Sequence, residues 1–95
     1  MTRATARALL RGDQEVSSDD LAEVFGAFGF CSEFEAPNAE IYYHEDFIDC
    51  GSYKDKEYIG RVLSHGQRAL VLQMVECVAY NERTRYGHEL PGPAD

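Results

Sequence analysis

The chain has 95 residues, which suits one small domain, and its 44% hydrophobic content is enough to build a core. Its net charge is −8, and residues 13–57 contain thirteen acidic residues and two lysines. This acidic segment disfavours nucleic acid as a partner and favours a basic partner or a solvated surface. No apolar run reaches about 18 residues, so we expect no membrane span.

The cysteines give no sign of a metal site or a disulfide framework. Cys31, Cys50 and Cys77 are odd in number and widely spaced, and no C-x-x-C pair occurs. We therefore expect reduced, structural thiols in a cytoplasmic protein. No secretory signal, nucleotide-binding motif or metalloprotease motif is seen, so we also expect no cofactor and no metal.

A short basic helix is predicted over Thr2–Arg11, ending at Gly12. It carries arginines at i, i+4 and i+8, namely Arg3, Arg7 and Arg11. This ridge is a candidate contact for nucleic acid. Pairing with the acidic segment of the same or a neighbouring chain is the favoured interpretation.

A second helix is predicted over residues 18–28. Ser17 supplies an N-cap, and two aspartates follow in the first turn. The apolar residues Leu21, Val24, Phe25 and Phe28 recur at helical spacing. Gly29 is then a natural stop.

After Gly29 the pattern alternates with a period of two, which predicts strands over 30–35 and 40–44 joined by a turn. In the second strand Ile41 and Tyr43 lie on one side, and Glu40, Tyr42 and His44 lie on the other. Residues 45–52 are ambiguous between strand and bulge. A turn is predicted at 54–56, and a third strand over 57–63.

A last, buried helix is predicted from Gln67 to about Tyr80, with Gly87 as its stop. The order of helices and strands predicts a two-layer α+β domain over residues 1–88. Residues 89–95 are expected to form a flexible C-terminal tail.

The run ALLRGDQEVSSDDLAEVFGAFGF, from Ala8 to Phe30, resembles the opening of HicA-like toxins of bacterial toxin–antitoxin pairs. Residues 40–44 resemble the second strand of that family, and residues 66–76 its final helix. The resemblance covers roughly residues 5–80 and rests on layout and apolar spacing. It implies a fold like a double-stranded-RNA-binding domain, α-β-β-β-α with an extra N-terminal helix, and an mRNA-cleaving activity that uses a histidine.

The chain departs from the family at the residues that carry the activity. Aligned on Ile41 and Tyr42, the glycine-serine-histidine signature falls on residues 37–40, and the catalytic histidine falls on Ala39. A methyl group cannot transfer a proton, so Ala39 cannot act as the general acid or base that the family's histidine provides. The acidic hairpin also lacks the cations that RNA phosphates require.

Two other histidines are candidates for catalysis. His65 is placed beside Gly66 at the start of the last helix, with Arg68 one turn on, where an anion could bind. His44 shares a strand face with Tyr42 and Glu40. Each also has a structural interpretation, as a loop histidine and as a cross-strand packing residue.

A protein-binding surface is the second kind of candidate site. Tyrosines among acids are frequent at interfaces and are also ordinary strand residues. The residues expected to bind a partner are Tyr42, Tyr43, Glu40, Tyr58 and Arg68.

Three functions stay open at this stage. The first is a HicA-like domain that is not an active enzyme and binds a protein partner such as an antitoxin. The second is a small acidic inhibitor of a nucleic-acid-binding host defence complex, like phage-borne anti-CRISPR proteins. The third is an active RNA endonuclease that uses His65 or His44. RNA binding is disfavoured by charge, and a homodimer is possible.

Overall fold

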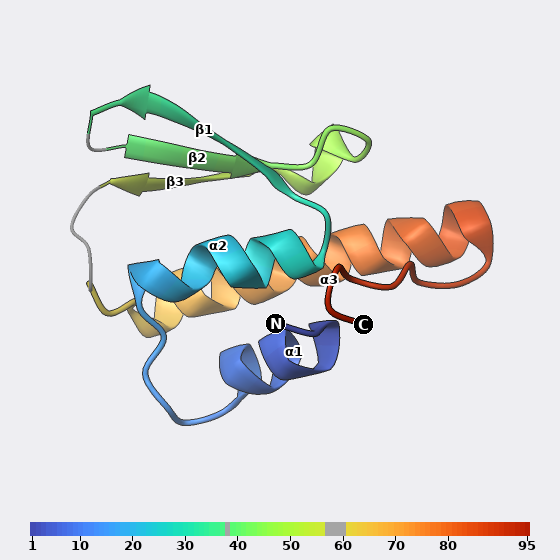
Figure 1. The fold of residues 1–95 in the computed structure, drawn as a ribbon, viewed down its shortest axis with the longest axis horizontal. Helices are drawn as coiled ribbons and strands as arrows, with labels where there is room; N and C mark the ends of the chain where they lie inside the picture. Colours follow the sequence, from blue (N-terminus) through green and yellow to red (C-terminus); the bar gives the residue numbers. More distant parts are fainter. Residues whose placement is uncertain (38, 57–60) are drawn as a thin grey trace.

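Helices cover one face of an antiparallel sheet, and α1 lies on the far side of α2 and α3 from that sheet (Figure 1). The structure, a computed structural model, describes residues 1–37, 39–56 and 61–95. Its elements are α1 (Arg3–Arg11), α2 (Ser18–Ala27), β1 (Cys31–Ala36), β2 (Ala39–Tyr43), η1 (Ile48–Cys50), β3 (Ser52–Lys56) and α3 (His65–Tyr86). After α1 the order is helix, three strands, helix, so the predicted α+β class is confirmed.

The second helix forms as its local sequence predicts. The carboxylate of Asp20 accepts a hydrogen bond from the backbone N–H of Ser17 at 2.9 Å, which closes a capping box. The predicted apolar stripe of α2 is buried. Gly29 has a φ of 80°, the left-handed conformation in which glycine ends a helix without strain.

The strand order is β1-β2-β3, and the third strand lies earlier in the chain than predicted. Residues 52–56 pair with β2, and Tyr53 lies opposite Tyr42. The turn predicted at 54–56 is therefore wrong. Its charged residues belong to an outer strand of the sheet, in which Ser52 and Lys54 are exposed and Tyr53 between them is buried.

The strand predicted over 57–63 falls partly outside the described residues, which exclude 57–60. The described remainder forms no regular strand. Val62 makes an isolated antiparallel bridge with Ser17, and the Leu63 side chain is buried. These contacts join the residues at the start of α2 to the residues just before α3.

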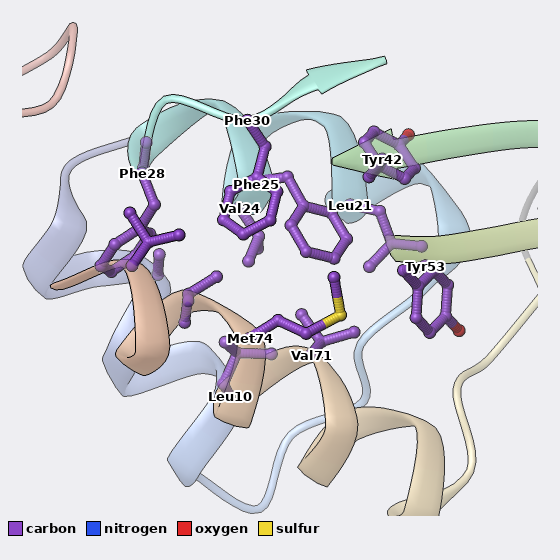
Figure 2. Close-up of a cluster of buried hydrophobic side chains, with 14 of the residues drawn as sticks. Leu10, Leu21, Val24, Phe25, Phe28, Phe30, Tyr42, Tyr53, Val71 and Met74 are labelled. Atoms are coloured by element: carbon purple, nitrogen blue, oxygen red, sulfur yellow. The ribbon is translucent and has the colours of Figure 1, made fainter. Parts of the chain in front are cut away.

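Phe25 is the centre of the core between the sheet and the helices (Figure 2). Its ring centroid lies 4.7 Å from that of Tyr42, 4.8 Å from Phe30 and 5.9 Å from Tyr53. Val71 and Met74 of α3 complete the cluster from the opposite side. A phenylalanine that contacts two strands and a helix couples the sheet to the helical layer through apolar burial.

The third α-helix has 22 residues, because its polar end continues for six residues past the apolar stretch predicted from Gln67 to about Tyr80. A capping box between Ser64 and Gln67 begins it, and Gly87, with φ 84°, ends it as predicted. No helix in the described ranges is long and apolar enough to cross a membrane.

The arginines of α1 are bound by acids of α3 and the segment that follows it. Arg7 donates to Glu76 at 2.9 Å and to Glu89 at 2.8 Å, and Arg11 also pairs with Glu76. The ridge thus pairs within its own chain, which is one of the two alternatives that the sequence left open, but the predicted partner, the acidic segment 13–57, is wrong. Helix packing determines which acids the ridge meets, because the main contacts of α1 are with α2 and α3.

Residues 89–95 fold back onto the helices. Glu89 also pairs with Arg83 at 2.7 Å, and the Leu90 N–H donates to Glu82 at 3.2 Å. Gly92 is so close to Ala27 that a Cβ would lie 2.7 Å from the Ala27 carbonyl oxygen. The flexibility expected of this tail stays a prediction.

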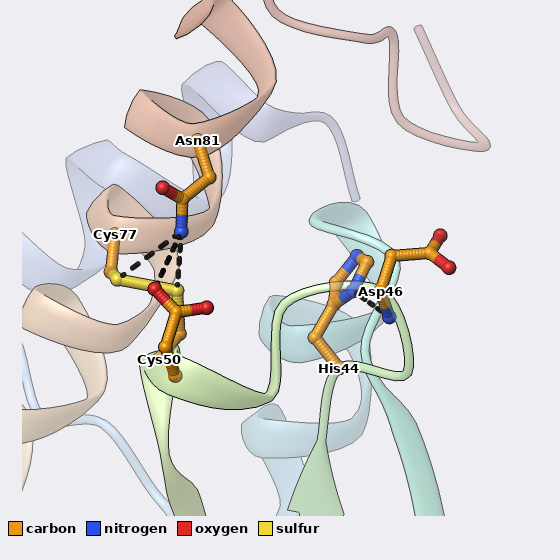
Figure 3. The surroundings of a disulfide bond; sticks show 6 residues. His44, Asp46, Cys50, Cys77 and Asn81 are labelled. Atoms are coloured by element: carbon orange, nitrogen blue, oxygen red, sulfur yellow. Dashed lines mark hydrogen bonds between the residues drawn. A yellow bond between two sulfur atoms is a disulfide. The ribbon is translucent and has the colours of Figure 1, made fainter. Parts of the chain in front are cut away.

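Cys50 of η1 and Cys77 of α3 form a disulfide (Figure 3). The expectation of three reduced thiols is therefore wrong for this pair, and Cys31 alone is free among the described cysteines. The cysteines are 27 residues apart, with a Cα–Cα distance of 5.7 Å. Packing of η1 against α3 brings them together, which a search for C-x-x-C spacing cannot detect.

We expect Cys50→Ser to lower the free energy of unfolding by about 3.5 kcal/mol, since the disulfide closes a loop of this length. Urea unfolding with and without dithiothreitol measures the effect. Cys31→Ser is the matched control and should unfold like the native protein. Reductant should destabilise the native protein and the control, but not Cys50→Ser. Equal native stability with and without reductant would contradict the assignment.

Candidate functional site

His44 lies just after β2 and points into the helical side of the sheet. The residue is 7% exposed, and its ring centroid lies 5.6 Å from that of Phe30 and 4.9 Å from that of Phe47. Its Nδ1 accepts a hydrogen bond from the Asp46 backbone N–H at 3.2 Å (Figure 3). In the neutral ring, the proton is then on Nε2. Burial lowers the pKa of His44, which favours this neutral form.

Arg3 and Glu82 form a buried ion pair beside His44. The guanidinium donates to both carboxylate oxygens, at 2.5 and 3.1 Å, and its Nε donates to the Ala27 carbonyl at 2.7 Å. It also lies 4.7 Å from the centroid of the Phe28 ring. Sequence reasoning took Arg3 for a surface residue and did not select Glu82. The arginine spacing in α1 was the available signal, but it does not identify the acid.

A cavity of about 390 Å³ joins these groups. It lies between the end of α2, the turn after β2, the C-terminal part of α3 and the last residues of the chain. Its lining comprises Arg3, Gly26, Ala27, Gly29, His44, Asp46, Phe47, Glu82, Tyr86, Leu90, Pro91, Gly92 and Pro93. This volume is in the range of small-molecule sites.

His65, the other candidate histidine, is not part of this cavity. It is the first residue of α3 and is exposed. Glu82, on the cavity wall, follows seventeen residues later in the same helix, which is roughly 25 Å along its axis. The structure therefore does not bring the two histidines together.

Tyr42 and Glu40 share a strand face with His44 as predicted, but this face points to the helices. Tyr42 is 3% exposed, and its hydroxyl donates to Glu40 at 3.0 Å. Burial and this carboxylate raise the pKa of Tyr42. The expectation that Tyr42 is an exposed binding residue is wrong, because its ring stacks on Phe25 in the core.

Tyr43 follows Tyr42 in β2, so it lies on the other face of the strand. No described helix covers that face of the sheet (Figure 1). The Tyr43 hydroxyl donates to Glu33 at 2.8 Å, and Lys54 pairs with Glu35 at 2.8 Å on the same face. We call this set the outer face; it consists of Cys31, Glu33, Glu35, Ile41, Tyr43, Ser52 and Lys54. Tyr58, the remaining predicted tyrosine, lies outside the described residues.

The Arg68 side chain caps the C-terminus of α1. Its guanidinium donates to the carbonyls of Leu10 at 3.0 Å, Leu9 at 2.7 Å and Gly12 at 2.7 Å. These are carbonyls that a helix end leaves without partners, and a cation there also favours the helix dipole. The described contacts of Arg68 are structural, and none joins it to His65.

One group of described residues offers three metal-ligating atoms, namely Asp49, Cys50 and Cys77, within 4.8 Å of one another. Both sulfur atoms are bonded in the disulfide, so they are not thiolate ligands. Asn81 Nδ2 fills this place with hydrogen bonds, including one to Asp49 at 3.3 Å (Figure 3). The group stabilises the contact of η1 with α3.

We expect Glu82→Gln to destabilise the fold by about 3–5 kcal/mol, because it leaves the Arg3 charge buried without its partner. Glu76→Gln, which alters the more exposed pairs with Arg7 and Arg11 on the same helix, is the control and should cost about 1–2 kcal/mol, at most about 1 kcal/mol for each pair. Urea unfolding measures both. The double substitution Arg3→Met/Glu82→Leu should restore most of the stability. Equal losses in Glu82→Gln and Glu76→Gln would contradict this account.

The titration of His44 predicts how stability depends on pH. An unfolded histidine has a pKa of about 6.5, and the folded-state value is lower, so the unfolded chain binds more protons below that pH. The contribution of His44 is complete above about pH 6.5 and falls as the pH drops towards the folded-state pKa. The free energy of unfolding, measured with urea at several values between about pH 7.5 and about pH 5.5, should decline in the native protein and decline less in His44→Phe. An identical decline in both proteins would contradict the assignment of this pH dependence to His44.

Comparison with known proteins finds no relative of this chain. No family model, curated protein or solved structure matches the chain. The resemblance to HicA-like toxins stays a hypothesis based on the layout of residues 5–80.

Proposed function

We propose that this protein is a HicA-like domain that does not cleave RNA and binds a basic protein partner through the outer face of its sheet. The observation that carries the proposal is that face itself. It combines an aromatic side chain, Tyr43, with Ile41 and two carboxylates, and no described helix covers it. Aromatic residues within a polar, accessible surface are typical of protein interfaces.

The edge strand β1 also carries an exposed apolar residue, on the other face of the sheet. Phe34 is 76% exposed, although its neighbours in the strand are polar. Single exposed apolar side chains are common on protein surfaces, so Phe34 offers a partner one aromatic contact and does not by itself require one. Phe34 pairs with Glu40, so its side chain lies on the opposite face of β1 from Glu33 and Glu35, and a partner that covers it has to reach around the edge of the sheet.

Charge opposes RNA as the ligand. The net charge is −8, and each arginine of α1 is already paired with a glutamate. Position 39, where the resemblance implies the catalytic histidine, is alanine. A protein with few free cations and no acid–base group at that position is poorly suited to bind and cleave a polyanion.

The acidic-inhibitor function is the second candidate, and the excess of acids in residues 13–57 favours it. It predicts a partner whose basic surface normally binds nucleic acid. A cytoplasmic location is part of our proposal and is supported by the resemblance. The Cys50–Cys77 disulfide weighs against it, because disulfides are rare in reducing compartments.

The binding experiment compares two double variants of equal charge. Glu33→Lys/Glu35→Lys alters the outer face, and Glu15→Lys/Glu23→Lys alters exposed acids elsewhere. A partner is captured from the native host, identified, purified and titrated by calorimetry. We expect a basic protein whose affinity falls at least about tenfold with the first variant and little with the second. Equal effects of both variants would place the interface elsewhere and contradict the proposal.

The RNA arm of the test uses the purified native protein and single-stranded transcripts. We expect no cleavage by the native protein or by His65→Ala. Cleavage by the native protein that His65→Ala or His44→Ala abolishes would instead establish the ribonuclease function. A partner that competes with nucleic acid for the bound surface would favour the inhibitor function over the antitoxin-type interaction.

A further inference from the structure

The His44 imidazole has a hydrogen-bond donor that no described residue uses. Its Nδ1 is occupied by the Asp46 N–H, so Nε2 bears the proton in the neutral ring. The described hydrogen bonds of His44 end there, and the ring is buried. A buried donor without an acceptor is costly, which is why nearly all such groups in folded proteins have a partner.

A glycine keeps this donor open to the cavity. Nε2 would lie 3.2 Å from a Cβ added to Gly29, and Gly29 and His44 both line the cavity. A side chain at position 29 would therefore cover the nitrogen. With glycine there, an acceptor atom in the cavity can approach Nε2.

The charges that line the cavity disfavour an anion as the natural occupant. Arg3, the cation in the lining, is neutralised by both oxygens of Glu82, and Glu89 lies 3.8 Å from Arg3 Nη1. A second cation, Arg85, stacks on the lining residue Phe47. Asp46 adds a further carboxylate to the lining. A phosphate or carboxylate would meet more negative than positive charge, whereas an uncharged acceptor would not.

The remaining walls are largely apolar, and the Phe47 ring among them also has the Arg85 guanidinium 4.6 Å from its centroid. Phe47, Tyr86, Pro91 and Pro93 contribute rings, and Leu90 an aliphatic side chain. Such walls bind a planar body, while a single polar group sets its orientation.

We propose that this cavity is a binding site for a small, uncharged, planar molecule whose carbonyl oxygen or ring nitrogen accepts a hydrogen bond from His44 Nε2. Neutral aromatic amides and uncharged nitrogen heterocycles are the chemical class. The site lies on the helical side of the sheet, so it is independent of partner binding at the outer face.

The test uses benzamide as the probe, with benzoate as its anionic counterpart and toluene as the analogue without an acceptor. Each is titrated to millimolar concentration into the full, oxidised, ¹⁵N-labelled protein and followed by NMR. We expect benzamide to shift the amide signals of Gly29, Phe47 and Gly92 and the His44 Nε2 resonance. Toluene should bind at least about twofold more weakly, the smallest effect of losing one neutral hydrogen bond. Benzoate keeps its acceptor oxygens and should bind more weakly because its charge meets the carboxylates of Asp46 and Glu82.

Two substitutions at one position separate the donor from the fold. His44→Phe removes the donor, and His44→Gln can present an N–H at a similar reach. We expect His44→Phe to weaken benzamide about three- to tenfold and His44→Gln to weaken it less. His65→Phe, the same change at an exposed histidine, should have no effect.

The His44 Nε2 resonance in the native protein tests the proposal even if His44→Phe does not fold. No shift of that resonance at millimolar benzamide would overturn the proposal. Equal binding of benzamide, benzoate and toluene would overturn it as well, because the site would then select neither charge nor acceptor.

Discussion

The contact on which much of this structure depends is the buried pair between Arg3 of α1 and Glu82 of α3. Both side chains are almost fully buried, so neither charge can remain without the other. The pair fixes where α1 lies on α3, and Arg3 Nε binds the end of α2 through Ala27. Because Glu82 also accepts from Leu90 N–H, the same carboxylate holds the last residues of the chain over the cavity.

The two faces of the sheet have different chemistry because the helices cover one of them. Tyr42 and Tyr43 are adjacent in β2, yet one stacks on Phe25 in the core and the other binds Glu33 on the outer face. The covered face ends at His44, whose polar ring reaches the cavity. The uncovered face retains its carboxylates in water. A domain of this kind can present a protein-binding surface and a separate small-molecule cavity.

Basic residues that suggest nucleic-acid binding in the sequence have structural partners instead. Arg7 and Arg11 bind Glu76, and Arg68 binds three carbonyls at the end of α1. These contacts consume cationic donors that an RNA phosphate would need. The pairing also explains how a chain of net charge −8 folds with its N-terminal helix against α3, since opposite charges meet there.

Local sequence determined the helices, their caps and the alternation of β2, because these depend on neighbours within a few residues. The Ser17–Asp20 capping box, the stop at Gly29 and the placing of Tyr42 and His44 on one strand face follow from such short spacings. Tertiary structure alone decided which strand face is buried, that residues 52–56 form β3, and that Cys50 meets Cys77. It also paired Arg3 with Glu82, 79 residues away. The choice among distant partners depends on how the helices and sheet pack, and single-residue patterns do not encode that packing.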